Sequence, residues 1–206
     1  MERSGAVLEI EVKLAASGVE EARGRLSRLP ARPETSMLFE SNDIYDTPQG
    51  ALAAAGRMLR LRVAGDETIL TFKERVETDL RAKVRREVQT TVESASAMRE
   101  IISKLGLVRV YRYQKYRAYS EWNDPQTGER LAICLDDTPI GVFLELEGPK
   151  DSIDRAAARM GYSQDDYILE DYRALHQAYL RDRGLPPGDL VFPDSQAGST
   201  PDASER

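Results

Sequence analysis

Hydrophobic and charged residues alternate at the beginning of the chain in a pattern that predicts a β-strand. Apolar residues occupy the even positions from 8 to 14, and charged residues occupy the odd positions between them, namely Glu9, Glu11 and Lys13. A period of two places the two kinds of residue on opposite faces of an extended strand. The same alternation returns at residues 142–148, where Leu144 and Leu146 alternate with Glu145 and Glu147.

Between these two acidic strands lie further segments of period two, whose polar positions are mostly Arg and Lys. We expect strands at 38–46, 58–63, 68–74, 83–92, 108–119 and 130–136. Apolar residues at spacings of three and four predict helices at 19–29, 96–106 and 151–161, and a final helix with Ile168, Tyr172, Leu175 and Tyr179 on one side. For the second helix, either Ser94 or Ser96 is the expected N-cap.

The number of charged strand faces indicates how these elements assemble. If the charged faces of all eight strands pointed to water, the apolar faces would need a cover that four helices cannot supply. A closed barrel avoids this problem, because its apolar residues face outward against the helices while its charged residues line a wet interior. We therefore predict an α+β fold in which an eight-stranded antiparallel β-barrel forms a tunnel flanked by about four helices.

Length and composition favour one soluble domain. The chain has 206 residues and a single cysteine, Cys134, so an intrachain disulfide is impossible and a cytoplasmic location is the simpler expectation. We expect a single domain over residues 1–184 and a tail over 185–206 that is disordered at its end. No run of about 18 apolar residues is present, which argues against a membrane span.

Charge is distributed unevenly along the chain. The net charge is −6, which argues against nucleic acid and anionic membranes as partners. Residues 57–117 nevertheless contain 15 Lys or Arg against 8 Asp or Glu, a local balance of +7, so the remainder carries −13. A basic middle in an acidic protein predicts a local anion site.

The expected tunnel lining suits phosphoryl chemistry. Carboxylates two residues apart on one strand face lie roughly 7 Å apart, close enough to share a divalent cation with a partner strand. Oxygen ligands without His or Cys favour Mg²⁺ or Mn²⁺. Basic residues beside such a cation match a triphosphate, and catalysis of phosphoryl transfer consists chiefly of positioning and charge neutralisation.

An ordered set of motifs carries a family resemblance. Glu9-x-Glu11-x-Lys13 is followed by Tyr45-Asp46-Thr47-Pro48, Leu59-Arg60-Leu61-Arg62, Leu70-Thr71-Phe72-Lys73, Arg86-Glu87, Lys115-x-Arg117, Leu135-Asp136 and residues 141–148. This series resembles the CYTH superfamily, or triphosphate tunnel metalloenzymes, which includes class IV adenylyl cyclases, thiamine triphosphatases and inorganic triphosphatases.

The resemblance implies roles for individual residues. Metal ligands would be Glu9, Glu11, Glu145 and Glu147, with Asp136 assisting. Phosphates would be bound by Arg60, Arg62, Lys73, Lys115, Arg117 and one of Arg85 and Arg86. Lys13 would act with Glu9 and Glu11 in catalysis, neutralising the phosphate near the attacked atom or orienting a nucleophile. Gln89 departs from the family pattern, in which many members carry a second acidic residue after Glu87.

Three functions are compatible with these residues. The first is a metal-dependent hydrolase of inorganic or organic triphosphate. The second is a class IV adenylyl cyclase, in which the ribose 3′-hydroxyl of ATP attacks the α-phosphorus and releases pyrophosphate. The third and lowest-ranked is a non-catalytic module that binds polyphosphate or nucleotide. Exposed Tyr and Trp residues suggest a homodimer, and we expect the polar loop at 75–81 to be mobile.

Overall fold

The structure is a computed structural model that describes residues 7–32, 34–75 and 85–193, without the side chains of residues 7–9 and 85. Its strands are β1 (Val7–Glu9), β2 (Glu11–Ala16), β3 (Leu38–Asp46), β4 (Arg57–Ala64), β5 (Glu67–Arg75), β6 (Arg85–Thr91), β7 (Val108–Asn123), β8 (Arg130–Thr138) and β9 (Gly141–Glu147). Its helices are α1 (Val19–Leu26), α2 (Ala51–Ala54), α3 (Ala95–Lys104), α4 (Lys150–Met160), the 3₁₀ helix η1 (Gln164–Asp166) and α5 (Tyr172–Asp182).

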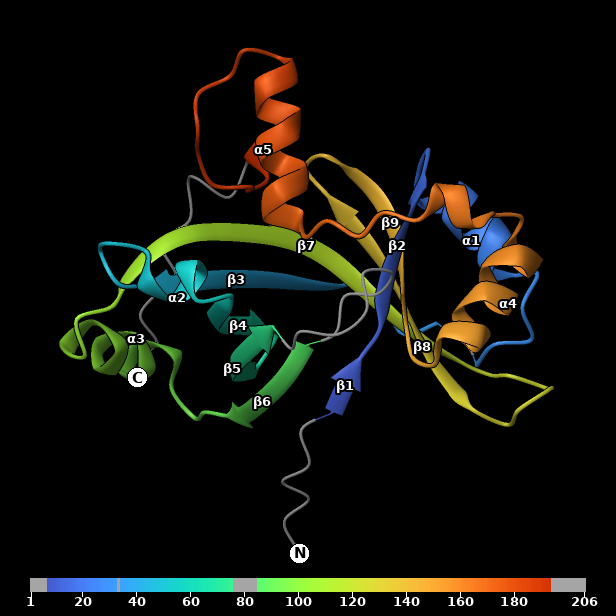
Figure 1. Ribbon diagram of the computed structural model, residues 1–206, viewed down its shortest axis with the longest axis horizontal. Coiled ribbons are helices and arrows are strands. Elements are labelled where there is room, and N and C mark those ends of the chain that lie inside the picture. Colours follow the sequence, from blue (N-terminus) through green and yellow to red (C-terminus); the bar gives the residue numbers. More distant parts are fainter. Residues whose placement is uncertain (1–6, 33, 76–84, 194–206) are drawn as a thin grey trace, which may run out of the picture.

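All strands belong to one antiparallel sheet in the order β1-β6-β5-β4-β3-β7-β8-β9-β2. The two edge strands, β1 and β2, are consecutive in the chain and are separated only by Ile10, whose carbonyl accepts a hydrogen bond from the Gly148 amide at 3.1 Å. One broken strand therefore pairs with β6 at one end and with β9 at the other, and the sheet curls around a hollow (Figure 1). Counting β1 and β2 as this single broken strand confirms the predicted eight-stranded barrel.

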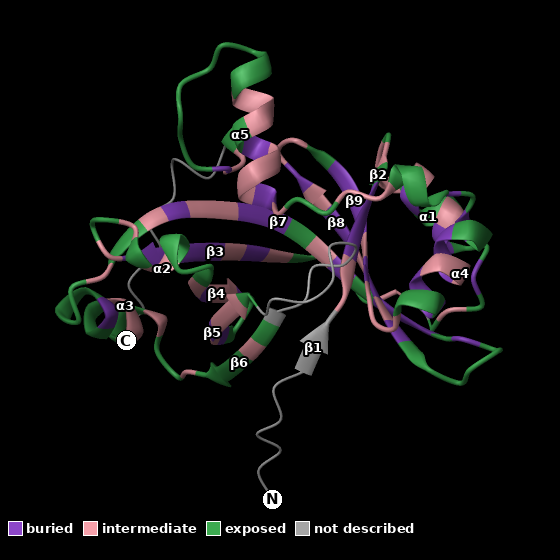
Figure 2. Cartoon of the chain, in the orientation of Figure 1, coloured by how far each residue is buried: buried purple, intermediate pink, exposed green. Residues whose placement is uncertain are grey.

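The apolar face of the sheet points outward, as predicted. Val12 and Leu14 of β2 and Leu144 of β9 pack in the largest hydrophobic cluster with residues of α1 and α4 such as Ala22 and Ile153. Figure 1 shows α1 and α4 lying side by side on this flank of the sheet. In Figure 2 the buried positions gather on β3, β7, β8 and β9, whereas β6 and α3 are mostly exposed. The odd-numbered charged residues of β2 and β9 are thus left to face the interior.

The last helix differs from the sequence prediction at its start. Ile168 does not lie on α5, because its backbone pairs with Lys13 of β2 through hydrogen bonds of 2.9 and 3.0 Å. The helix begins only after Asp171, whose side chain accepts a hydrogen bond from the Ala174 amide. This arrangement places the first turn of α5 at the open end of the hollow.

The segment after α5 returns to the sheet. Leu190 bridges to Tyr113 of β7 and is 2% exposed, in a cluster with Ile44, Tyr111, Phe143 and Tyr172. Within the expected tail, Leu190 therefore packs against the sheet although residues 185–189 are exposed. Residues 194–206 and most of the loop expected at 75–81 lie outside the described residues. Within the described parts of the chain, each helix is too short or too polar to cross a membrane.

Candidate functional site

The hollow of the sheet contains a cavity of about 480 Å³. Of the described residues that line it, nine are basic: Lys13, Arg57, Arg60, Arg62, Lys73, Arg75, Lys115, Arg117 and Arg173. Six are acidic: Glu11, Asp46, Glu87, Glu145, Glu147 and Asp171. The lining therefore has an excess of three positive charges, in a protein whose net charge is −6.

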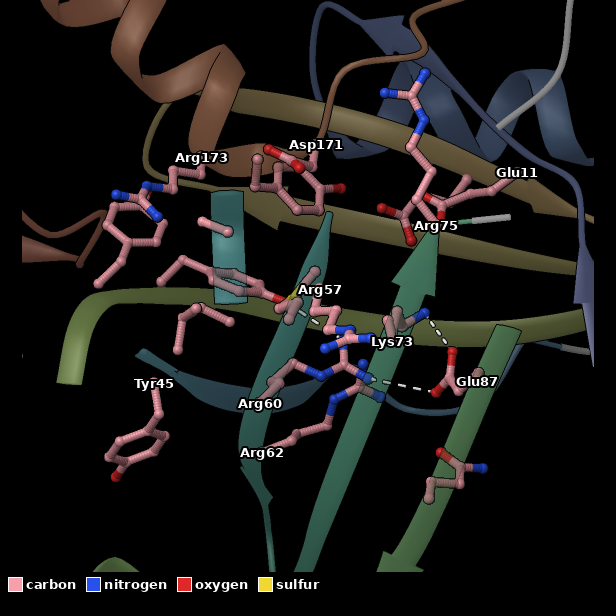
Figure 3. A pocket seen from close by; sticks show the side chains of 18 of the residues that line it. Glu11, Tyr45, Arg57, Arg60, Arg62, Lys73, Arg75, Glu87, Asp171 and Arg173 are labelled. Atoms are coloured by element: carbon pink, nitrogen blue, oxygen red, sulfur yellow. Dashed lines mark hydrogen bonds and ion pairs between the residues drawn. The ribbon is translucent and has the colours of Figure 1, made fainter. Parts of the chain in front are cut away.

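Strands β4 and β5 form a basic wall of this cavity (Figure 3). Arg60 donates to the Thr71 hydroxyl at 3.3 Å, and its Nε is a buried donor without a hydrogen-bond partner among the described residues. Arg62 donates through Nε to the Asn42 side-chain oxygen at 3.1 Å. Burial and the neighbouring Arg60 lower the pKa of Arg62, although Glu40, whose carboxylate lies 3.6 Å from Arg62 Nε, acts in the opposite direction.

Glu87 of β6 is the acidic partner of the basic wall. It forms an ion pair with Lys73, and its other oxygen lies 3.9 Å from Arg60 Nη2. Figure 3 shows Glu87 directed toward both cations. Arg86, the next residue toward the N-terminus, is exposed and does not line the cavity, because alternation along β6 places it on the opposite face. The side chain of Arg85 lies outside the described residues.

On β7 the predicted phosphate ligands Lys115 and Arg117 are held by a buried carboxylate. Asp136 of β8 is completely buried, and it accepts hydrogen bonds from Lys115 Nζ at 2.9 Å, Arg117 Nε at 2.6 Å and the Tyr172 hydroxyl at 2.6 Å. Burial opposes the ionised form, but Arg117 and Lys115 hold the pKa of Asp136 below its usual value. Asp136 does not line the cavity, so the structure places it behind the basic residues rather than at the predicted metal site.

The acidic strands β2 and β9 lie side by side along another part of the lining. Glu11 is the direct register partner of Glu147, and Lys13 is that of Glu145. Lys13 forms ion pairs with Glu11 and, at 3.4 Å, with Glu145. Although burial lowers the pKa of Lys13, Glu145 and Glu11 raise it above its ordinary value, so this side chain stays protonated at neutral pH.

The donor set fits a divalent cation in part. Two carboxylates opposite each other on neighbouring strands repel one another unless a cation offsets them, and their oxygens are ligands that Mg²⁺ and Mn²⁺ prefer. Among the residues that the structure describes, no group of three or more Asp, Glu, His or Cys side chains converges on one point. The side chain of Glu9, the fourth predicted ligand, lies outside the described residues.

Sequence reasoning missed several lining residues. Arg57, at the start of β4, has the opposite parity to Arg60 and Arg62, so alternation does not predict that it faces the cavity. Arg75 continues the alternation of Lys73 on β5, but it falls in the loop expected at 75–81.

Asp171 and Arg173 come from the start of α5, and Figure 3 places them together at one end of the cavity. Tyr172 was expected only on the packed face of that helix. The three residues at the start of α5 carry no strand-periodicity signal, because the topology alone brings this helix to the barrel.

The site can now be compared with known proteins. The family model for the CYTH domain matches residues 8–172 of the chain. No curated protein matches it. Among solved structures, a candidate adenylate cyclase from Vibrio parahaemolyticus has a TM-score of 0.68 at 18% identity, over 84% of this chain and 99% of that one.

Two archaeal structures are similar to a comparable degree. A conserved hypothetical protein from Pyrococcus furiosus has a TM-score of 0.64 at 19% identity, over 80% of this chain and 97% of its own. A protein from Pyrococcus horikoshii has a TM-score of 0.63 at 20% identity, over 80% and 96% respectively. At these identities the likeness concerns the fold, and it extends over nearly the whole of each neighbour.

Proposed function

Because the chain belongs to the CYTH domain family, we propose that it is a metal-dependent enzyme that hydrolyses inorganic or organic triphosphate inside the charged cavity. The observation that carries this proposal is the lining itself, in which nine basic residues face six acidic ones within about 480 Å³. A polyanion would compensate the three excess positive charges of the lining, and it would accept a hydrogen bond from the Nε of Arg60, a buried donor that has no partner among the described residues.

The basic side chains of β4, β5 and β7 would bind phosphate oxygens from different sides of the cavity. Arg60, Arg62 and Lys73 approach from one wall, while Lys115 and Arg117 approach from β7. Fixed cations of this kind stabilise charge on a transferring phosphoryl group without needing to reorganise. Arg85 remains a further candidate for this set, as its register partner Arg75 lines the cavity.

The acidic residues of β2 and β9 would hold Mg²⁺ or Mn²⁺. Glu11 and Glu147 are the best-placed pair, with Glu9 and Glu145 as the remaining candidates. When bound, the ion would neutralise phosphate charge and polarise the bond that breaks. Lys13 is a permanent cation beside this pair, so its role is to attract a phosphate oxygen rather than to remove a proton from water.

A second candidate function is a class IV adenylyl cyclase. It is supported by the name of the Vibrio parahaemolyticus neighbour, which shares the fold over most of both chains. The two reactions would use the same cavity lining and differ in the phosphorus atom that lies beside the nucleophile. In the hydrolase this is the terminal phosphorus, and in the cyclase it is the α-phosphorus of ATP.

Product identification distinguishes the two reactions. Purified protein is incubated with Mg²⁺ or Mn²⁺ and, separately, ATP and inorganic triphosphate. Orthophosphate released from triphosphate without cyclic AMP from ATP supports the hydrolase. Cyclic AMP with an equal amount of pyrophosphate supports the cyclase, and binding of both compounds with no product would leave a non-catalytic binding module.

A further inference from the structure

Glu40 of β3 is a buried carboxylate beside two of the phosphate-binding cations, and the proposed function does not use it. The residue is 5% exposed and does not line the cavity. Its Oε2 lies 3.6 Å from Arg62 Nε and 3.8 Å from Lys115 Nζ. This oxygen is buried and has no hydrogen-bond partner among the described residues. A negative charge is therefore enclosed directly behind two cations that face the cavity.

The register of β3 brings Glu40 to these cations. Glu40 is the partner of Lys115 on β7. Asn42, two residues further along the same face of β3, is the partner of Arg62 on β4. On the β4 side Glu40 is opposite Ala64, whose methyl group offers no polar partner. Pairing of β3 with both of its neighbours therefore places this carboxylate against the two cations and leaves it without a hydrogen-bond donor.

Glu40 does not orient either cation. Arg62 Nε donates to the Asn42 side-chain oxygen at 3.1 Å, and Lys115 Nζ donates to Asp136 at 2.9 Å. The contacts of Glu40 with both cations are longer than the usual N–H···O distance of about 2.7–3.2 Å. Arg62 and Lys115 would therefore keep their positions without Glu40, whose effect on the cavity is that of its charge.

The charge of Glu40 also acts beyond these two contacts. Burial lowers the pKa of Arg60, but Tyr113 and, more weakly, Glu40 help to raise it above its ordinary value. Two unit charges about 10 Å apart, at an effective dielectric constant of about 20, change a binding equilibrium on the order of tenfold. A carboxylate this close to the phosphate-binding cations therefore weakens the binding of an anion on their far side.

We propose that Glu40 weakens phosphate binding in the cavity through its charge and thereby speeds the release of pyrophosphate. Pyrophosphate is a product both of the hydrolysis of inorganic triphosphate and of the cyclase reaction, so the inference applies to either candidate reaction. It rests on the proposed function, because it assigns the control of product release at the same site. Binding substrate and product more tightly through the same cations gains no rate, and product release limits turnover in many enzymes.

The test measures the affinity of pyrophosphate for the wild type and for Glu40→Gln by calorimetry in EDTA. The substitution removes the charge and keeps the shape of the side chain, so we expect the dissociation constant to fall on the order of tenfold. Affinity differences between closely related complexes arise mainly in the dissociation rate, so tighter binding means slower release. Structural damage to the site would weaken binding, and a gain in affinity therefore reports on the charge.

The control variant is Glu100→Gln, at an exposed position on α3. It changes the net charge of the protein by the same amount as Glu40→Gln but lies outside the cavity. We expect it to bind pyrophosphate like the wild type.

Unchanged or weaker binding of pyrophosphate in Glu40→Gln would overturn the inference, and weaker binding would make Glu40 a residue that holds the cations in place. If Glu40→Gln does not fold, Glu40→Met replaces it, because methionine removes the charge without bringing an amide donor toward Arg62 and Lys115. Failure of both variants to fold would show that the charge is required as a structural counter-charge, which also overturns the inference.

Turnover of inorganic triphosphate by the wild type with Mg²⁺ is measured separately. If turnover is absent but pyrophosphate binds, the proposed hydrolase function fails, and the affinities still decide the role of Glu40. If turnover is present and Glu40→Gln binds pyrophosphate no more tightly, only the inference fails. A wild type that binds neither pyrophosphate nor inorganic triphosphate overturns both.

Discussion

At the scale of single residues, the buried Asp136 carboxylate determines where two cations lie. Its contacts with Lys115, Arg117 and Tyr172 use both of its oxygens. A carboxylate that is engaged in this way aligns the cations and has little capacity left for a metal ion. Asp136 is therefore better interpreted as a positioning residue than as the assisting metal ligand that the family resemblance implies.

Replacement of Asp136 tests this interpretation through stability. Asp136→Asn leaves Lys115 and Arg117 with one fewer buried counter-charge, so we expect the free energy of unfolding to fall by about 3–5 kcal/mol in urea titrations. Asp137→Asn is the matched control, because burial raises the pKa of Asp137 and none of the described cations is paired with it. If Asp136→Asn unfolds like the wild type but loses affinity for Mn²⁺, Asp136 is a metal ligand after all.

Arg60 provides a second test at this scale. Arg60→Ala removes a charged donor to phosphate, a contact worth about 1.5–3 kcal/mol, so affinity for inorganic triphosphate should fall roughly 10- to 150-fold. The melting temperature without ligand should change far less, because Arg60 lies beside other cations. Arg86→Ala, on the exposed face of β6, serves as the control. Equal affinity in both variants would remove Arg60 from the site.

At the scale of elements, the pairing of β2 with β9 brings two acidic side chains into opposition. The register joins Glu11 to Glu147 and Lys13 to Glu145, so the strand pair presents carboxylates and one cation to the same part of the cavity. No single strand has this property. It follows from antiparallel pairing in one particular register, since a slip by one residue would turn these side chains to the outer face.

Neutralising one member of the acidic pair separates catalysis from folding. We expect Glu147→Gln to lower Mg²⁺-dependent turnover by at least 100-fold, because a divalent cation loses a charged ligand. The circular dichroism spectrum and melting temperature should stay close to those of the wild type. Glu93→Gln, at an exposed position before α3, should behave as the wild type. Full activity in Glu147→Gln would exclude Glu147 from the metal site.

Helix α5 carries a titratable contact to β7. Burial lowers the pKa of His176, which is hydrogen-bonded to Tyr111, although Asp189 acts in the opposite direction. The unfolded chain therefore binds a proton more readily than the folded protein does below pH 6.5. Stability should be unaffected above pH 6.5 and should decrease as the pH falls from there through the lower pKa of the folded state.

Melting temperatures between pH 7.5 and pH 5 measure this contribution of His176. The wild type should lose stability across the lower part of this range, whereas His176→Gln, which does not titrate, should give a flatter profile. The carboxylates of Asp136 and Glu145 contribute only at lower pH, because their unfolded pKa values are 3.8 and 4.5 and folding lowers them further. Identical pH profiles for the two proteins would show that His176 does not cause the loss of stability at the acidic end of this range.

At the scale of the whole molecule, charge is segregated between the cavity and the rest of the surface. The described cavity lining has three excess positive charges although the chain is negative overall. The acidic surroundings disfavour nonspecific adsorption of long polyanions, while the cavity walls concentrate a positive field on a small ligand. This distribution suits a compact triphosphate better than a nucleic-acid surface.

The salt dependence of triphosphate binding tests whether the positive charges of the cavity attract the ligand. Affinity for inorganic triphosphate should decrease as NaCl rises from 50 to 500 mM, because screening weakens the attraction of several cations for one polyanion. The matched measurement uses orthophosphate, which has fewer charges and should show a weaker dependence. Calorimetric titrations at several salt concentrations give both slopes. Equal slopes would mean that the extra phosphates of the ligand do not contact the basic walls.

Much of the fold was predictable because strand alternation is a local property. Polar and charged residues that alternate with apolar ones along β2, β4, β5 and β9 indicate both the strands and the face that turns inward, and closure then brings those faces together. The structure accordingly places Glu11, Lys13, Arg60, Lys73 and Glu147 in one cavity, as the pattern implied. The helix boundaries were likewise indicated by local signals, such as Ser94 before α3 and Gly106 after it.

The sequence by itself therefore determined the strands, their inward charges and the family. Only the tertiary structure decided which distant side chains complete the cavity. Tyr172 and Arg173 reach it because the Ile168 backbone pairs with β2 and directs α5 to the mouth of the barrel. Leu190 enters the core because β7 has a free edge beside it, and Asp136 lies behind Lys115 because of the β7–β8 register. These outcomes depend on contacts between segments far apart in the chain, which no local periodicity encodes.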